Sequence, residues 1–392
     1  MIRTPKVFID CNRCDDDYIR TEIDYVDYVR DRRNADVHVL IANVPAGGGG
    51  EQYTVTFLGR NRFAGINDTT IFSTNSTMSN DAVRQKLVQA IEIGLLPYVS
   101  KTKMIENITL DVTADIKEEV EDPWNYWVYE LELFGDLEGE ESREEHRVFG
   151  AVNAERVTKD LKLDFRADGH VREEQFTFTD SAGNEITATS NRQWWNIFGN
   201  VIPTINDHWA YGGFFRTNSN SYRNIDLSYE FFGGIEYNIF PYPESVQREF
   251  RLQYRLGYIH YDYVEETLYN KTEEGLFKNR FEAIVTFTQP WGETVTTLEA
   301  SSYLNDFSKN RVVFDAELEI FLFEGFSLDI NGRYSIINDQ INLAKGNLSS
   351  EDVLLRQQEL ATNYEYNLRV GISYTFGSIY NNVVNPRFEP RF

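Results

Sequence analysis

The chain has 392 residues and a formal net charge of −24, and such an acidic chain without a basic patch is not expected to bind nucleic acid. Hydrophobic residues make up only 41% of it and aromatic residues 14%, a mixture typical of a transmembrane β-barrel, in which half of each strand is polar. No apolar run approaches the ~18 residues of a membrane-spanning helix, so a membrane location would require strands.

The first 115 residues predict a small α/β or α+β domain with the element order βαββαβ. The run Gly47–Gly50 is a turn rather than a phosphate loop, because no Gly-Lys-Ser/Thr pattern follows it and it opens no helix. An acidic linker over residues 116–123 ends the domain. The expected strands are Lys6–Asp10, Asp36–Val44, Glu51–Gly59 and Ile105–Val112, and the expected helices are Asp16–Arg33 and a segment from Asn80 or Asp81 to Pro97.

The two cysteines, Cys11 and Cys14, stand where the first strand meets the first helix. A local disulfide would suit an oxidising periplasm. A redox-active Cys-x-x-Cys pair is an alternative, because a helix N-terminus lowers a thiol pKa, although a thioredoxin-like context is missing. A metal site is a third interpretation, with acidic residues near but no second Cys/His pair, and two unpaired thiols are a fourth.

Residues 124–376 predict a twelve-stranded antiparallel transmembrane β-barrel. Alternating apolar and polar residues recur about every 20 residues, and side chains that alternate along a strand give it one apolar and one polar face. A soluble sandwich with amphipathic strands is the alternative. The segments are Trp127–Leu133, Arg147–Val157, Leu161–Asp168, Gln193–Ile202, Trp209–Arg216, Asn224–Phe240, Phe250–Asp262, Arg280–Thr288, Thr294–Leu304, Val312–Phe323, Phe326–Ile336 and Asn363–Phe376.

The connections between these segments alternate in length, which favours the barrel. Short turns such as Thr158–Asp160 alternate with longer ones such as Gly135–His146 and Gly169–Arg192, and outer-membrane barrels have short periplasmic turns and longer outer loops. The last long connection contains a possible short helix over Ser349–Ala361. Aromatic residues beside the short turns predict a lipid-interface girdle of Trp127, Trp209, Tyr211, Tyr237, Trp291, Tyr374 and Phe376.

The last segment should close the barrel against Trp127–Leu133, because an open strand edge cannot persist in hydrocarbon. The polar faces would then line a lumen in which acids outnumber bases. This predicts either a narrow, cation-preferring conduit or an interior plugged by salt bridges. The lumen-lining set is Glu130, Glu132, Arg147, Lys162, Asp164, Arg166, Glu230, Glu236, Arg251, Arg255, Glu282, Asp315, Glu317, Glu319, Asp329, Arg333, Glu365 and Arg369.

An enzyme on the barrel is the alternative from a different functional class. A lipase- or protease-like barrel would need a histidine with a partner at the outer rim, and His146, His170 and His260 are candidates. No histidine has a serine two residues later. We therefore predict no catalytic residues, no metal ligands and no cofactor.

Two stretches carry a resemblance. They are Val7-Phe-Ile-Asp-Cys-Asn-Arg-Cys-Asp15, continued to Val39, and Tyr374-Thr-Phe-Gly-Ser-Ile-Tyr-Asn-Asn-Val-Val-Asn-Pro-Arg-Phe388. Together they resemble a largely uncharacterised Bacteroidota-type family of outer-membrane proteins with a small periplasmic domain before a β-barrel. The resemblance covers nearly the whole chain and implies location and architecture but no activity.

The expected protein is therefore a porin-like outer-membrane protein. Its N-terminal domain and its C-terminal tail, residues 377–392, would lie in the periplasm, and a signal peptide would have been removed. The expected function is a passive conduit or a structural envelope component whose periplasmic domain docks a partner, or a subunit of a larger outer-membrane assembly. Its partners would be outer-membrane lipid and a periplasmic or outer-membrane protein.

Overall fold

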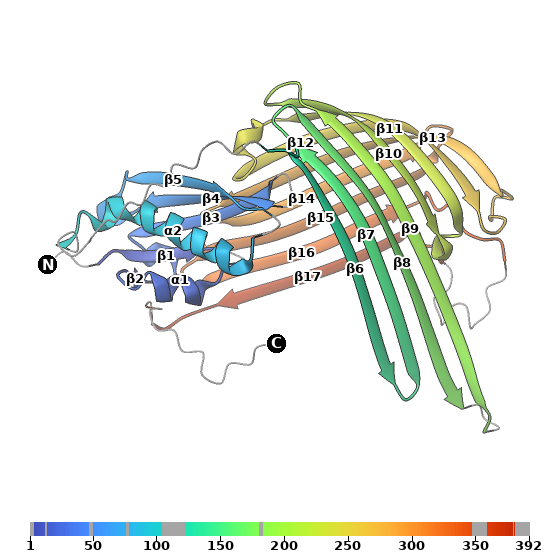
Figure 1. The fold of residues 1–392 in the computed structure, drawn as a ribbon, viewed down its shortest axis with the longest axis horizontal. Coiled ribbons are helices and arrows are strands. Elements are labelled where there is room, and N and C mark those ends of the chain that lie inside the picture. The colour runs from blue at the N-terminus through green and yellow to red at the C-terminus, as the bar shows by residue number, and fades with distance from the viewer. Residues whose placement is uncertain are drawn as a thin grey trace.

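The computed structural model describes residues 4–11, 14–46, 50–75, 78–103, 122–179, 183–346, 359–378 and 380. It is mostly β, with a small mixed α/β region at the N-terminus and a large antiparallel sheet after it (Figure 1). Among the described helices, none is both long enough and apolar enough to cross a membrane.

The N-terminal region is a five-stranded sheet with two helices packed on it. The strand order is β2-β1-β3-β4-β5, in which β1 runs parallel to β2 and β3 and the remaining pairs are antiparallel. Its core contains fully buried side chains such as Phe57, Ile91 and Tyr98. The elements are β1 (Lys6–Asp10), α1 (Asp16–Glu22), β2 (Asp27–Tyr28), β3 (Val37–Ala46), β4 (Gly50–Gly59), β5 (Asn67–Ser73) and α2 (Asn80–Val99).

The predicted helix over Asp16–Arg33 is wrong after Glu22. Residues 27–29 pair with the first strand instead, because Asp27 N–H donates to the Pro5 carbonyl at 3.0 Å and Val29 N–H to the Val7 carbonyl at 2.9 Å. The apolar residues that suggested helical spacing, such as Ile23 and Val26, are buried all the same.

Two other N-terminal predictions need correction. The strand β5 was missed because its side chains are mostly exposed and carry little apolar alternation. Pro97 lies inside α2 rather than ending it. The expected strand Ile105–Val112 and most of the linker lie outside the described residues.

The second sheet has twelve strands, and each is antiparallel to its neighbours in sequence, in the order β17 to β6. All twelve predicted strands are present. They are β6 (Trp127–Glu140), β7 (Arg143–Val157), β8 (Leu161–Thr179), β9 (Glu185–Pro203), β10 (Trp209–Asn220), β11 (Ile225–Asn238), β12 (Arg248–Tyr263), β13 (Glu273–Gln289), β14 (Gly292–Tyr303), β15 (Asp306–Phe323), β16 (Phe326–Ile337) and β17 (Tyr364–Tyr374).

Several predicted long connections are strand instead. The residues Gly135–His146 are almost all in β6 and β7, and most of Gly169–Arg192 is in β8 and β9. The extensions carry charged residues on the polar face and few apolar ones, so alternation is weak there. Cross-strand ion pairs such as Arg143–Glu138 at 3.4 Å accompany the hydrogen-bonded ladder in this part. Figure 1 shows these long strands running at a steep angle to β14–β17.

The expected pairing of the last strand with Trp127–Leu133 is not seen. Among the described residues, β17 pairs with β16 and β6 pairs with β7, and no ladder joins β6 to β17. Both edge strands are strongly exposed, with Leu131 at 80% and Ile372 at 72%. The sheet is therefore open between β6 and β17.

Gly94 of α2 allows the helix to approach the small sheet closely. A Cβ atom at this position would lie 2.0 Å from two atoms of the Phe57 ring. We predict that Gly94→Val destabilises the N-terminal region by about 1–3 kcal/mol, because the core cannot accept the added volume without strain. Hydrogen exchange of β3 and β4 should increase. Gln89→Val, at an exposed position on the same helix, should leave it nearly unchanged, and equal exchange in both variants would refute this account of the glycine.

Candidate functional site

Every residue predicted to line a lumen lies on one face of the twelve-stranded sheet. The register shows this directly: Glu317 pairs with Asn331, and Asn331 pairs with Arg369. The opposite face carries exposed apolar side chains such as Leu368 and Phe231. The sheet is thus polar on one face and apolar on the other along its whole width.

Ion pairs form within and between strands of this polar face. The Arg166 guanidinium lies 3.2 Å from both Glu132 and Asp168. Arg280 pairs with Glu299 at 3.3 Å. Side chains of both signs therefore offset one another over part of the face.

The most buried acid of the polar face, Glu145, was missed from the sequence because it stands in a predicted loop. Only 2% of its side chain is exposed. It contacts Arg143 and lies 2.8 Å from Arg147 and 2.9 Å from Arg172. Three guanidinium groups thus surround one carboxylate near the start of β7.

The N-terminal region contacts the end of β15 and the short turn that follows it. Arg32 donates to the Phe321 carbonyl at 3.0 Å and its guanidinium lies 4.4 Å from the Phe321 ring centroid. Arg33 donates to the Leu322 carbonyl at 2.8 Å. Asn34 donates to the Glu324 carboxylate at 2.7 Å, and the Asp31 carboxylate accepts from the Gly325 N–H at 2.7 Å. We call residues 31–34 the docking loop.

Burial lowers the pKa of the Arg32 guanidinium, while the nearby carboxylates of Asp10 and Asp31 act in the opposite direction. These two acids therefore favour the charged form that donates to the Phe321 carbonyl. This arrangement makes Arg32 the buried centre of the docking loop.

The hairpin of β3 and β4 faces the polar side of the large sheet. One cavity of about 520 Å³ lies between Asn43 on the hairpin side and the acids Glu293, Glu317 and Glu319. A second, of about 860 Å³, separates Val44 and Gln52 from residues of β8 to β13, including Lys162 and Arg251. Because one hairpin faces strands from β8 to β16, it sits within the concave side of the sheet, at the end with the short turns.

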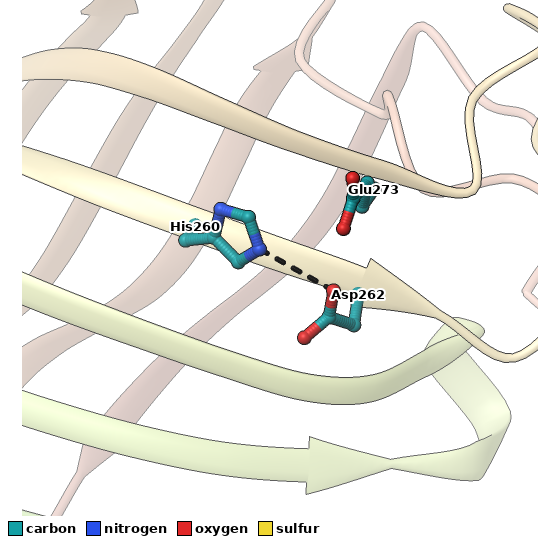
Figure 2. Close-up of side chains that lie close together, drawn as sticks. All are labelled: His260, Asp262 and Glu273. Carbon is teal, nitrogen blue, oxygen red and sulfur yellow. Dashed lines mark hydrogen bonds and ion pairs between the residues drawn. The ribbon is translucent and has the colours of Figure 1, made fainter.

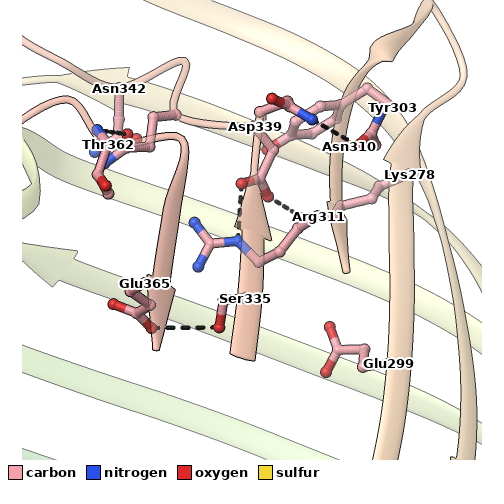
Figure 3. A network of polar contacts seen from close by, with 12 residues as sticks. Lys278, Glu299, Tyr303, Asn310, Arg311, Ser335, Asp339, Asn342, Thr362 and Glu365 are labelled. Atoms are coloured by element: carbon pink, nitrogen blue, oxygen red, sulfur yellow. Dashed lines mark hydrogen bonds and ion pairs between the residues drawn. The ribbon is translucent and has the colours of Figure 1, made fainter. Parts of the chain in front are cut away.

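A segment at the opposite end, residues 338–346, crosses the polar face. Asp339 accepts from Arg311 Nε at 2.8 Å and from Lys278 Nζ at 3.3 Å (Figure 3). Farther along, Asn342 donates to the Arg223 carbonyl at 2.8 Å and the Leu343 carbonyl accepts from Leu268 N–H at 2.8 Å. The segment thus spans from β16 to the connections that flank β11 and β12, and we call it the strap.

A cavity of about 210 Å³ lies beneath the strap, lined by polar side chains that include Arg216, Glu230 and Glu299. The predicted short helix at 349–361 lies mostly outside the described residues, so it is not tested. The polar face is therefore covered at both ends, by the N-terminal hairpin and by the strap.

The predicted girdle residues gather at the short-turn end, where the docking loop lies. The rings of Trp209 and Tyr237 are 4.5 Å apart and those of Tyr374 and Phe376 are 5.6 Å apart. Tyr211 is exposed, and Trp291 occupies the turn between β13 and β14. Trp127 stacks on Tyr129 at the start of β6.

The two cysteines form a disulfide, with Cα atoms 5.8 Å apart, at the end of β1. Both pack partly buried against the small core. Cys11 also lines the cavity that faces Glu293 and Glu317.

The three rim histidines are not brought together. His146 lies on the apolar face of β7, whereas His170 lies on the polar face and stacks on Trp194 at 5.7 Å. His260 lies on the apolar face of β12 and stacks on Tyr229 at 4.9 Å. The two remaining histidines form hydrogen bonds with nearby residues. His38 lies 2.7 Å from the Asp10 carboxylate, and His208 lies 2.8 Å from the Asn238 carbonyl.

Comparisons with known proteins assign the chain to no family. No protein-family model matches the chain, and no curated protein matches it. Thirteen solved chains match, among them a NanC porin structure at 12% sequence identity and a TM-score of 0.29. That match covers 60% of this chain and 98% of the porin chain.

Asp339 holds the strap by pairing with two cations in a buried place, where only 7% of its side chain is exposed. We predict that Asp339→Ala destabilises the protein by about 3–5 kcal/mol, because it leaves the buried Lys278 ammonium unpaired. Trypsin cleavage after Lys345 should become faster.

Glu266→Ala is the matched control, because it removes an exposed ion pair to Lys345 at 3.3 Å. This change should cost less than about 1 kcal/mol. Equal cleavage rates and equal thermal midpoints for the two variants would contradict the role given to Asp339.

Proposed function

We propose that the chain is an outer-membrane β-barrel protein in which β6 and β17 pair to close the sheet. The polar and apolar faces of the sheet support this, because a barrel in hydrocarbon needs an apolar outer face and has no open edge. Both edge strands carry their apolar residues on the same side of the sheet, for example Leu131 and Leu368. Pairing them would join the two faces without a break.

We place the short turns and the N-terminal domain, residues 1–115, in the periplasm as part of the same proposal. An even number of strands brings both ends of the barrel to one side of the membrane. The exposed aromatic rings at this end suit a lipid interface. The resemblance to Bacteroidota-type outer-membrane proteins implies the same placement.

The function that follows is a narrow cation-preferring conduit that its own N-terminal domain keeps closed. The observation that carries it is the β3–β4 hairpin seated on the concave polar face at the short-turn end. Acids outnumber bases among the lining residues, so cations would be favoured where the path opens. A partner that binds the docking loop would free the path.

A permanently closed envelope component is the competing function within the same fold. The ion pairs of the polar face and the strap favour it, because they fill space within the barrel. An enzyme receives less support, since the rim histidines lie on different faces of the sheet.

Weakening the docking loop should open the conduit. The double variant Arg33→Ala/Asn34→Ala removes two hydrogen bonds to residues 322–324. At about 0.5–1.5 kcal/mol each, their loss should raise the open population roughly tenfold. Planar-bilayer recordings of the full chain should show more frequent cation-selective openings.

Arg84→Ala is the matched control, because Arg84 pairs with Asp15 and Asp81 within the N-terminal domain instead of with the large sheet. It should behave as the unchanged chain does. Openings equally frequent in all three proteins would rule out closure by the domain, and no openings in any of them would favour the closed envelope component.

A further inference from the structure

The ends of β12 and β13 carry a set of metal-binding side chains that the proposed conduit does not use. His260 and Asp262 are two residues apart on β12, and therefore on one face, while Glu273 begins β13 directly opposite Asp262 (Figure 2). Their ligand atoms all lie within 4.8 Å of one another. The sequence alone did not reveal the set, because Glu273 joins it only through the register of the two strands.

The two carboxylates face each other, and within the described residues neither has a lysine or arginine partner. Like charges directly opposite on antiparallel strands repel and destabilise the pair. In the described part of the chain, no lysine or arginine forms an ion pair with either one, and the Asp262 carboxylate lies 3.3 Å from His260 Nε2. A cation between the three groups would remove this repulsion.

The donor set selects the kind of cation. One imidazole nitrogen and two carboxylate oxygens suit a divalent transition-metal ion, whereas Mg²⁺ and Ca²⁺ prefer oxygen ligands alone. Two donors bound to Zn²⁺ at ~2.1 Å lie at most ~4.2 Å apart, so small rotations of these side chains, none of which is buried, would bring all three into range.

The position of the imidazole is already held by its surroundings. The His260 ring stacks on Tyr229 with centroids 4.9 Å apart and planes 17° apart. One residue beyond Asp262, the buried Tyr263 donates to Glu274 at 2.8 Å and ties β12 to β13. Only the carboxylates have to move.

We propose that His260, Asp262 and Glu273 bind one divalent transition-metal ion, with Zn²⁺ as the ligand to test. Three protein ligands leave at least one position for water or for a group of another molecule. This site would lie at the end of the sheet that carries the strap, and it does not depend on whether the conduit opens.

Titration calorimetry of the full chain in detergent micelles with Zn²⁺ tests this site. We expect one equivalent to bind, and His260→Ala and Asp262→Asn each to weaken binding by at least ~10-fold. Glu273→Gln should weaken it in the same direction. Absorption of Co²⁺ in place of Zn²⁺ should show nitrogen ligation that His260→Ala abolishes.

His146→Ala is the matched control, because His146 also lies on the apolar face of a strand near the same end. It should leave the affinity unchanged. Zn²⁺ affinity that is the same in the unchanged chain and in His260→Ala would overturn the proposal, as would an equal loss in His146→Ala.

Discussion

The structure depends on the two-residue period of a β-strand, kept in register over twelve strands. A shift of one residue in any strand would exchange its apolar and polar faces. The pairing instead places Leu328 opposite Ile372 and Asp329 opposite Gly371, and similar pairs continue across the sheet. Everything that the polar face does follows from this constraint, because it gathers charges from twelve strands onto one surface.

Two local structures cover that polar surface, one at each end. The docking loop binds mainly to backbone carbonyls at the end of β15, those of Phe321 and Leu322. Such contacts are individually modest, so they suit a domain that can be displaced. The strap is held more firmly, since Asp339 pairs with two cations in a buried place. The two ends of the polar face thus differ in the strength of their closure.

The strands of the large sheet were predictable from sequence because period-two alternation is a local signal. All twelve were found, and so were the residues Glu365 and Arg369 on the polar face of the last strand. The extensions of β6 and β7 were not, because a segment such as Asp136–Glu140 carries acidic residues at alternate positions and few apolar ones between. Likewise, the edge strand β5 has too few buried residues to show a face.

Contacts that join distant parts of the chain were beyond the sequence. From the sequence, Arg33 is expected to be a surface arginine, and only the fold brings the end of β15 at Leu322 beside it. Asp339 stood in a predicted loop, and its partners Lys278 and Arg311 are far away in sequence. The disulfide of Cys11 and Cys14 was one of several interpretations, since spacing alone does not distinguish a disulfide from a metal or redox pair.

The most direct test of the account is the environment of single spin labels along β17 in lipid bilayers. Labels replacing Leu368, Val370 and Ile372 should be accessible to oxygen dissolved in lipid, and labels replacing Asn367, Arg369 and Gly371 should be accessible to a water-soluble relaxation agent. A two-residue alternation between these environments is the result that a membrane barrel predicts. Equal access of the water-soluble agent to all six positions would contradict it.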